Sequence, residues 1–333
     1  MKIAVIGGVG STEVLVQALV KHGFEQVKVW GYQPTKTALV SGWRDLRQLA
    51  GSLKLPFESF VKVTDCEDSL RSFAPDFFFV VGLSQIVPAS MLNIASRGNI
   101  GFHPTALPFG RGRAALAWLI LERQDGAATF FELVNGVDEG PIFEQEVFTV
   151  SETDDTSDVE AKLLCAEEVA LDHWLPVLKK GELIATEQDH ENATWFGRRA
   201  PEDGWLNWLA NCDDLLNLIR ASAPPHPGAF TYCRNSKVEI HRASRSRRPE
   251  TGVPGRILKV YPKGIFDVQA GDGILHVTEW KTDGDWLPRV GVRLGYYDET
   301  EIFDLRIRLA KLEQTVECLN AKIIKMGISE SLD

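Results

Sequence analysis

The sequence predicts an α/β protein with an open, mostly parallel sheet, a small β-domain after it, and a C-terminal helix. Three observations predict this order. Apolar segments of strand and helix type alternate up to residue 180, short strands with Gly and Pro turns prevail over 205–290, and apolar residues recur at heptad spacing from Ile302. The chain has 333 residues, of which 44% are hydrophobic, so its length and composition suit two domains with sizeable cores.

The first part of the chain carries the pattern of a Rossmann-like sheet. Residues 2–6 form a short apolar strand that ends in a glycine turn and precedes a helical pattern. Phe77–Val81 is apolar without interruption, as expected of a strand buried on both faces. The further expected elements are strands over 27–30, 100–103, 127–134 and 143–150 and helices over 89–95, 114–122 and 157–180. They predict a domain over 1–195, with a linker over 181–204.

The glycine turn after the first strand, Gly8-Val9-Gly10-Ser11-Thr12-Glu13, begins like a dinucleotide-binding fingerprint. Its sixth position is Glu13, and an acidic side chain at the start of a helix repels a pyrophosphate. The turn is therefore expected to have a structural role. If an anion binds here, Ser11 and the backbone N–H groups of residues 10–12 are expected to hold it.

Residues 205–295 are expected to form a small β-domain, either an OB-like barrel or a sandwich, because short apolar strands alternate there with Gly and Pro turns. The basic stretch 241–248 lies inside this region. It is short, and the net charge of the chain is −10, so we expect a solvated loop rather than a nucleic-acid site.

A coiled-coil helix is expected over 299–328. The apolar residues at every a and d position of four heptads are Ile302, Leu305, Leu309, Leu312, Val316, Leu319, Ile323 and Met326. Mostly β-branched residues at a with mostly Leu at d favour two parallel strands, in which Glu301 faces Arg306 and Arg308 faces Glu313 of a second chain. The alternative is an amphipathic helix docked on its own domain. The matching charges favour a homodimer through residues 302–326.

The cysteines and the apolar runs indicate the compartment. Five scattered cysteines form no CxxC pair, which argues against a disulfide framework and against a metal site. Residues 1–8 lack the apolar stretch of a signal peptide, and no apolar run approaches the roughly 18 residues of a membrane span. We therefore expect a cytoplasmic protein without a membrane segment.

The stretch GFHPTALPFGRGR, residues 101–113, places His103 at the carboxyl end of a predicted strand, the edge where open α/β sheets bind ligands. Its prolines stiffen the turn, and its glycines let the backbone approach a ligand closely. His103 is therefore a candidate catalytic residue. Arg111 and Arg113 are candidates for binding a phosphate or carboxylate, with structural ion pairs as the alternative.

A second turn, NGVDEGPI over 135–142, joins two predicted strands and carries Asp138 between glycines. One interpretation is a hairpin loop with polar turn residues. The other is a carboxylate that orients the imidazole of His103 or accepts a proton. Nothing in the spacing alone brings the two side chains together.

These two turns, in this order and at this spacing, resemble the formyltransferase family, which includes methionyl-tRNA formyltransferase and the bacterial sugar N-formyltransferases. The resemblance is carried by His103-Pro104-Thr105-Ala106-Leu107-Pro108, Arg111-Gly112, Trp118 and Asp138-Glu139-Gly140-Pro141-Ile142. Residues 81–88, VGLSQIVP, resemble the segment that lines the folate pocket of the family. Residues 203–208, 219–221, 227–230 and 254–258 resemble its C-terminal β-barrel. The heptad tail is not part of the family pattern.

The resemblance implies 10-formyltetrahydrofolate as co-substrate and transfer of its formyl group to an amine. Such a transfer needs a donor to the oxyanion that develops and an acceptor for the amine proton. The resemblance assigns these roles to His103 and Asp138 and leaves their division open. The implied folate-binding residues are Gly82, Leu83, Ser84, Gln85, Ile86, Val87, Pro88, Val137 and Asp138. The expected substrate-binding residues are Ser11, Thr105, Arg111 and Arg113.

One position departs from the family pattern. The family has Asn two residues before the His, and here that residue is Gly101. Loss of one oxyanion donor typically costs on the order of a hundredfold in rate. Asn99 points to the same face and is a third catalytic candidate, but it lies about 6.6 Å further back along an extended strand, so it needs a bulge at Gly101. Ser84 and Gln85 are the other candidate donors.

The charge pattern guides the choice of substrate. Methionyl-tRNA formyltransferase has a basic loop after its second strand, whereas the corresponding residues 32–41 lack a basic cluster and the whole chain is acidic. Both points weigh against tRNA. Residues 101–105, GFHPT, and 110–113, GRGR, resemble the formyltransferases that act on activated amino sugars, so the resemblance implies an amino sugar that is linked to a nucleotide and used for surface glycans. The alternatives are methionyl-tRNA, N-hydroxyornithine or a peptide as substrate, and a non-catalytic folate- or sugar-binding scaffold.

Overall fold

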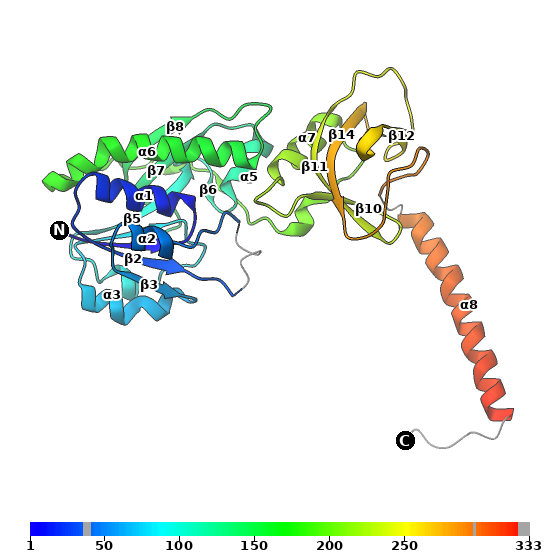
Figure 1. Cartoon of the computed structure of the whole chain (residues 1–333), viewed down its shortest axis with the longest axis horizontal. Coiled ribbons are helices and arrows are strands. Elements are labelled where there is room, and N and C mark those ends of the chain that lie inside the picture. Colours follow the sequence, from blue (N-terminus) through cyan, green and yellow to red (C-terminus); the bar gives the residue numbers. More distant parts are fainter. Residues whose placement is uncertain (36–40, 296–297, 326–333) are drawn as a thin grey trace.

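The computed structural model describes residues 1–35, 41–295 and 298–325 (Figure 1). Its larger sheet has seven strands in the order β3-β2-β1-β4-β5-β7-β8. The strands are β1 (Lys2–Gly7), β2 (Gln26–Tyr32), β3 (Phe57–Phe60), β4 (Phe77–Val81), β5 (Gly98–Thr105), β7 (Gly126–Glu132) and β8 (Ile142–Phe148). The first five run parallel, and β7 and β8 are antiparallel to their neighbours. The predicted open, mostly parallel sheet is confirmed.

Helices cover both faces of this sheet (Figure 1). They are α1 (Gly10–Lys21), α2 (Arg47–Ser52), α3 (Glu67–Phe73), α4 (Ala89–Leu92), α5 (Ala115–Glu122) and α6 (Thr156–Lys180), with single-turn helices at Val63–Cys66, His190–Asn192, Pro201–Gly204 and Pro262–Gly264. The helices α1, α5 and α6 share one core with the sheet, and α3 and α4 share the other. Because both faces are covered, Phe77, Phe78 and Phe79 of β4 are all fully buried.

The second sheet has five antiparallel strands in the order β10-β11-β14-β13-β12. These are β10 (Ala229–Cys233), β11 (Ser236–Arg245), β12 (Ile257–Val260), β13 (Phe266–Gln269) and β14 (Ile274–Thr282). Helix α7 (Cys212–Ala221) packs on this sheet through Leu215 and Ile219, and together they form a core of their own. The predicted β-rich C-terminal part is confirmed, whereas its closure into an OB-like barrel stays a prediction.

A two-stranded parallel sheet joins the linker to the turn after β5. It pairs β6 (Arg111–Gly112) with β9 (Trp195–Phe196). The sequence predicted neither strand, because each has only two residues and no periodic pattern. The pairing brings residues 188–196 over the end of β5, where the candidate site lies.

The last element is α8 (Asp298–Lys325), which projects from the C-terminal part of the chain in Figure 1. Every side chain from Thr300 to Ile324 is exposed. The last predicted heptad residue, Met326, lies outside the described residues. Within the described ranges, no helix is long and apolar enough to span a bilayer.

Candidate active site

His103 and Asp138 meet at the edge of the larger sheet. His103 is the sixth residue of β5, and Asp138 lies in the loop between β7 and β8. The distance from His103 Nδ1 to Asp138 Oδ2 is 3.5 Å, and the other ring nitrogen, Nε2, lies 2.8 Å from the carbonyl oxygen of Gly110. A carbonyl oxygen only accepts, so Nε2 carries a hydrogen and donates it to Gly110. In the neutral ring, Nδ1 is therefore the basic nitrogen, and it faces the carboxylate.

The turn that carries Asp138 is held from two sides. The backbone N–H of Gly112 donates to Asp138 Oδ2 at 2.8 Å. The side chain of Gln188 donates from Nε2 to the carbonyl oxygens of Asp138, at 2.9 Å, and Gly140, at 2.7 Å. Asp138 itself has a left-handed backbone with φ of 55°, a conformation that Asp tolerates better than most residues. Gln188 and Gly112 thus fix a carboxylate in an unusual backbone position beside His103.

Arg111 is part of this support and not a surface cation. Only 1% of Arg111 is exposed. Its guanidinium donates to Gln188 Oε1 from Nε at 3.2 Å and from Nη2 at 2.7 Å, and Nη2 also lies 3.1 Å from His190 Nδ1. Its Nη1 lies 3.8 Å from Glu139 Oε1. That Arg111 contacts substrate stays a prediction, and in this structure its donors are engaged by the linker and by the Asp138 turn.

Two more predicted substrate-binding residues are buried. Thr105 is 1% exposed, and its hydroxyl donates to the Phe109 carbonyl at 2.7 Å, which closes the turn after β5. Ser11 is 5% exposed and lies beside the buried carboxyl of Glu167. Burial and these contacts give both side chains a structural role, and binding of substrate by Thr105 and Ser11 stays a prediction. Arg113 is exposed, and no ion pair of its guanidinium occurs within the described parts of the chain.

Asn99 does not join the pair. Strand β5 pairs with β7 in regular register from Ile100 to His103, and its irregularity comes only after His103. Without a bulge at Gly101, Asn99 lies about 13 Å before His103 along the strand. Its amide nitrogen donates to the Leu92 carbonyl at 2.8 Å, on the way from α4 into β5. The prediction that Asn99 takes part in catalysis is therefore corrected.

The place of the family Asn is filled by apolar side chains. A Cβ on Gly101 would lie 2.7 Å from Leu133 Cδ2 and 2.7 Å from Phe131 Cζ. Phe131 is the cross-strand neighbour of Gly101. The space next to Gly101 therefore holds no polar side chain, and none can be added there unless these two side chains move.

The segment 82–88 after β4 has three kinds of residues. Leu83 and Val87 pack against the core beneath α3 and α4. The amide of Gln85 accepts from the Val63 N–H at 2.8 Å and donates to the Val61 carbonyl at 2.8 Å, so it is not free to act as an oxyanion donor. Ser84 and Ile86 are exposed, Ile86 by 91%. Of Ser84 and Gln85, the two candidate donors to the oxyanion, Ser84 is therefore the one whose polar group is exposed and available.

Several apolar side chains in the segments that follow β4, β5 and β7 and in β9 are exposed. Val137 precedes Asp138 and is 60% exposed, Phe109 precedes Gly110 and is 49% exposed, and Trp195 of β9 is 59% exposed. With Ile86 they come from four separate segments around the ends of β4 and β5. Apolar groups beside a few placed polar groups are typical of small-molecule sites.

The glycine turn has a structural role. A Cβ on Gly7 would overlap the Val81 carbonyl oxygen and the Thr12 side chain. The Thr12 hydroxyl donates to that carbonyl at 2.8 Å and accepts from the Gly8 N–H at 3.0 Å. Glycine thus lets the ends of β1 and β4 approach closely at the start of α1, as expected for a tight turn.

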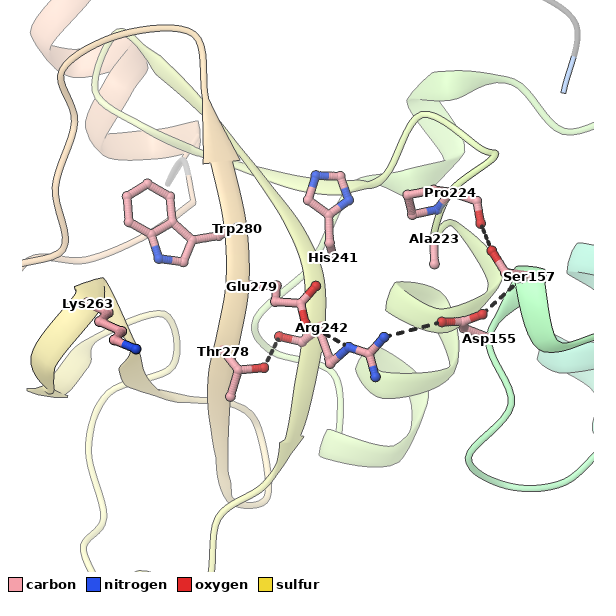
Figure 2. A pocket seen from close by; sticks show the side chains of 10 residues that line it. All are labelled: Asp155, Ser157, Ala223, Pro224, His241, Arg242, Lys263, Thr278, Glu279 and Trp280. Carbon is pink, nitrogen blue, oxygen red and sulfur yellow. Dashed lines mark hydrogen bonds and ion pairs between the residues drawn. The ribbon is translucent and has the colours of Figure 1, made fainter. Parts of the chain in front are cut away.

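A cleft of about 560 Å³ lies elsewhere, between the start of α6 and strands β11 and β14 (Figure 2). Figure 2 shows Arg242 between Glu279, at 3.1 Å, and Asp155, at 3.8 Å. None of the predicted site residues lines it. The basic stretch around this cleft is largely compensated, since Arg245 pairs with Asp213 and Asp272, and Arg248 pairs with Glu250 and Asp267.

The support of Asp138 by the linker could not be read from the sequence. Gln188 lies 50 residues from Asp138 in a stretch without a repeated pattern. Thr194 accepts the Gly110 N–H at 2.8 Å through its hydroxyl and is equally inconspicuous. The aromatic pair Trp195-Phe196 was the one local signal that this linker packs on something.

The chain shares its fold with several solved structures that are only 16–18% identical to it in sequence. HypX from Aquifex aeolicus in complex with tetrahydrofolic acid has a TM-score of 0.65 at 16% identity, over 87% of this chain and 46% of that chain. This chain thus spans about half the length of the HypX structure that it matches. The N-formyltransferase from Helicobacter canadensis in complex with folinic acid and dTDP-3-aminofucose has a TM-score of 0.64 at 16% identity, over 84% and 100% of the two chains. Methionyl-tRNA formyltransferase from Clostridium thermocellum has a TM-score of 0.52 at 18% identity, over 74% and 94%.

Two family models match the sequence itself. The model described as formyl transferase matches residues 52–175, and the model described as formyl transferase, C-terminal domain, matches residues 199–286. The first match contains His103 and Asp138, and the second contains the five-stranded sheet. Since both domains of one family occur here in order, the chain belongs to the formyltransferase family.

Proposed function

We propose that this chain transfers the formyl group of 10-formyltetrahydrofolate to the amine of an activated, nucleotide-linked amino sugar. The observation that carries the proposal is the His103–Asp138 pair at the carboxyl edge of the parallel strands. Membership of the formyltransferase family supports the reaction type. The amino-sugar substrate is supported by the fold shared with an N-formyltransferase that was solved with dTDP-3-aminofucose.

The pair supplies the base of the reaction. His103 Nε2 is committed to the Gly110 carbonyl, so Nδ1 is the ring nitrogen that can gain a proton. The proton that the attacking amine loses enters the pair at Asp138 and Nδ1 and leaves an imidazolium beside a carboxylate. The pair returns this proton to the folate nitrogen when the bond between that nitrogen and the formyl carbon breaks. Asp138 is the more exposed of the two side chains, with 17% against 7%, and therefore faces the substrate. The separation of 3.5 Å is longer than a strong hydrogen bond and is expected to shorten when substrate binds.

The residues around the pair fit a folate. The co-substrate supplies the activated formyl group. Ile86, Phe109 and Val137 offer exposed apolar surface for a flat heterocycle, and the backbone of 82–88 and 135–138 offers hydrogen-bonding groups at its edge. Burial of these side chains under a ligand accounts for exposure that the free chain otherwise leaves unexplained.

Charge supports an anionic small molecule over tRNA. The net charge of −10 disfavours a polyanion, and the arginines of the basic stretch 241–248 are mostly ion-paired. Arg113 is exposed next to the pair and is the cation that we assign to a phosphate of the nucleotide. We place the reaction in the cytoplasm, in keeping with the five free cysteines, and we include a homodimer through residues 302–326 in the proposal.

The test is to incubate each of a set of nucleotide-linked amino sugars with 10-formyltetrahydrofolate and to measure the release of tetrahydrofolate. We expect turnover with at least one sugar. His103→Ala and Asp138→Asn are expected to lower kcat by at least about 100-fold, because the proton acceptor is lost or neutralised. The control variant His173→Ala changes an exposed histidine on α6 and is expected to keep full activity. Activity on charged initiator tRNA, with none on any sugar, would replace the proposed substrate.

A non-catalytic folate- or sugar-binding scaffold is the second candidate, and Gly101 favours it. The missing amide donor and the apolar filling by Phe131 and Leu133 remove a group that the family uses. Stoichiometric binding of a reduced folate, without formyl transfer to any amine, would select the scaffold. Turnover that is lost in His103→Ala would exclude it.

A further inference from the structure

Helix α8 carries an apolar stripe that no described part of the chain covers. The seven a and d residues from Ile302 to Ile323 are between 45% and 61% exposed. They occupy one side of a helix of 28 residues, about 42 Å long at the usual rise. A soluble chain rarely leaves a continuous apolar stripe of this length in water, so the stripe indicates an interaction surface.

We infer that α8 binds the α8 of a second copy of this chain, in parallel and in register, as a two-stranded coiled coil. The spacing of the stripe alternates three and four residues without a break, which is the seam of a left-handed supercoil and is too narrow for burial on a flat domain surface. The a positions are Ile302, Leu309, Val316 and Ile323, and the described d positions are all Leu. β-Branched residues at a with Leu at d select two strands.

The flanking charges select the parallel arrangement. In a parallel pair, each g position faces the e position of the next heptad on the other chain. Glu301 then faces the partner's Arg306, and Arg308 faces the partner's Glu313, so both pairs attract. In a fully overlapped antiparallel pair, e faces e, and Glu313 meets the partner's Glu313.

The side of α8 that lies away from the a and d residues favours a pair of helices over a larger bundle. Phe303, Ile307 and Ile324 are apolar and exposed outside the stripe, but the polar residues Gln314 and Glu317 interrupt this second row at its middle. A parallel two-stranded pair also puts both copies of the five-stranded sheet at the same end of the helices, since α8 follows directly after that part of the chain.

Cysteine cross-linking of the full chain tests the orientation. The exposed cysteines Cys165 and Cys318 are first changed to Ser, and Leu305→Cys is added at a d position near the start of α8. With oxidised glutathione, we expect a covalent dimer, because only parallel, in-register helices bring the two thiols of this position together. The control variant Ile307→Cys, one half-turn on at outer position f, is expected to stay monomeric on a denaturing gel. Equal cross-linking of both variants, or cross-linking of neither, would overturn the inference.

Charge exchange tests the register. Arg308→Glu sets two acidic groups against each other at both symmetry-related pairs, and we expect dimer dissociation to become easier by about tenfold. The double variant R308E/E313R restores opposite charges and is expected to restore the dimer. By light scattering, the unaltered chain should give one species of twice the chain mass of 37.1 kDa. A monomer, a larger assembly, or failure of the double variant to recover would contradict a parallel pair. Because α8 lies outside both sheets and Cys165 is an exposed residue of α6, none of these substitutions alters the proposed active site.

Discussion

The side chain of Gln188 forms hydrogen bonds to three residues, so mutations can test its accepting and donating contacts separately. Its carbonyl oxygen accepts from Arg111, while its amide donates to the backbone of Asp138 and Gly140. Gln188→Glu keeps an acceptor for Arg111 but removes both donors. We expect it to lower kcat by about 10- to 100-fold through displacement of the Asp138 carboxylate. The KM for the formyl donor should stay close to that of the unaltered chain, and the thermal midpoint should fall less than in Gln188→Ala, because the buried guanidinium keeps its partner.

Two comparisons distinguish positioning from a general loss of structure. Gln188→Ala also removes the acceptor of Arg111, so it should lower both kcat and the free energy of unfolding, the latter by about 1–3 kcal/mol. Gln124→Ala, at an exposed position after α5, should change neither. If Gln188→Glu lost stability without a change in kcat, the positioning role would be wrong.

Which single residues could be assigned from the sequence depended on the local chemistry around them. His103 and Asp138 could be selected because each lies in a turn rich in Gly and Pro beside a strand, and the resemblance joined them. The burial of Arg111 could not be predicted, because an arginine in a turn has the same letter whether it is buried or exposed. Gln188 was missed since its partners lie about 50 and 77 residues away. Burial and nonlocal hydrogen bonds are settled by packing, which a local pattern does not contain.

At the level of the elements, the contact of α1 with α6 buries a carboxyl group. Glu167 of α6 is fully buried beside Ser11, and among the described residues neither of its oxygens has a hydrogen bond of normal geometry. Burial raises the pKa of Glu167 well above its ordinary value of 4.5, and the nearby Ser11 hydroxyl only partly opposes this. The folded chain therefore retains a proton that the unfolded chain releases.

This proton gives the packing of α1 on α6 a pH dependence. Above the unfolded-chain value of 4.5, the folded state binds more protons than the unfolded state, so the free energy of unfolding falls as pH rises. The expected contribution to the slope is about −1.4 kcal/mol per pH unit until pH passes the folded pKa. Glu167→Gln should remove this part of the slope in urea denaturation series from pH 5 upward, whereas Glu168→Gln, at the exposed neighbouring position, should keep it. Equal slopes in all three proteins would show that Glu167 is ionised in the fold.

Elements with a regular period were predicted well, and short ones were not. Strand β4 and helix α6 follow from an unbroken apolar run and a long amphipathic pattern. Strands β3, β6 and β9 have four, two and two residues, and their pairing depends on what the rest of the sheet leaves open. The heptads of α8 were read from spacing alone, since a helix without tertiary contacts is governed by its own period.

In the whole molecule, hydrogen bonds at the start of α6 connect the part with the larger sheet to the part with the five-stranded sheet and α7. The Thr156 hydroxyl lies 3.1 Å from the carbonyl oxygens of both Arg220 and Ala221 at the end of α7, and the Ser157 hydroxyl donates to the Pro224 carbonyl at 2.6 Å. Arg220 in turn donates to the Glu152 carbonyl before α6. Ser157 and Pro224 line the cleft in Figure 2, which shows the hydrogen bond between them, so this polar contact lies beside an open space.

Helix α8 takes no part in this connection. This leads to a prediction about the entire chain. All its described side chains from Thr300 to Ile324 are exposed, so removal of the helix exposes no core. A chain that ends at Gly295 is therefore expected to keep its thermal midpoint and its formyl transfer per chain, while its mass by light scattering becomes that of a monomer. Circular dichroism should lose the helical signal of α8 alone. A drop of the midpoint by more than about 4 °C, which corresponds to roughly 1 kcal/mol or more, would mean that α8 packs on the sheets in solution.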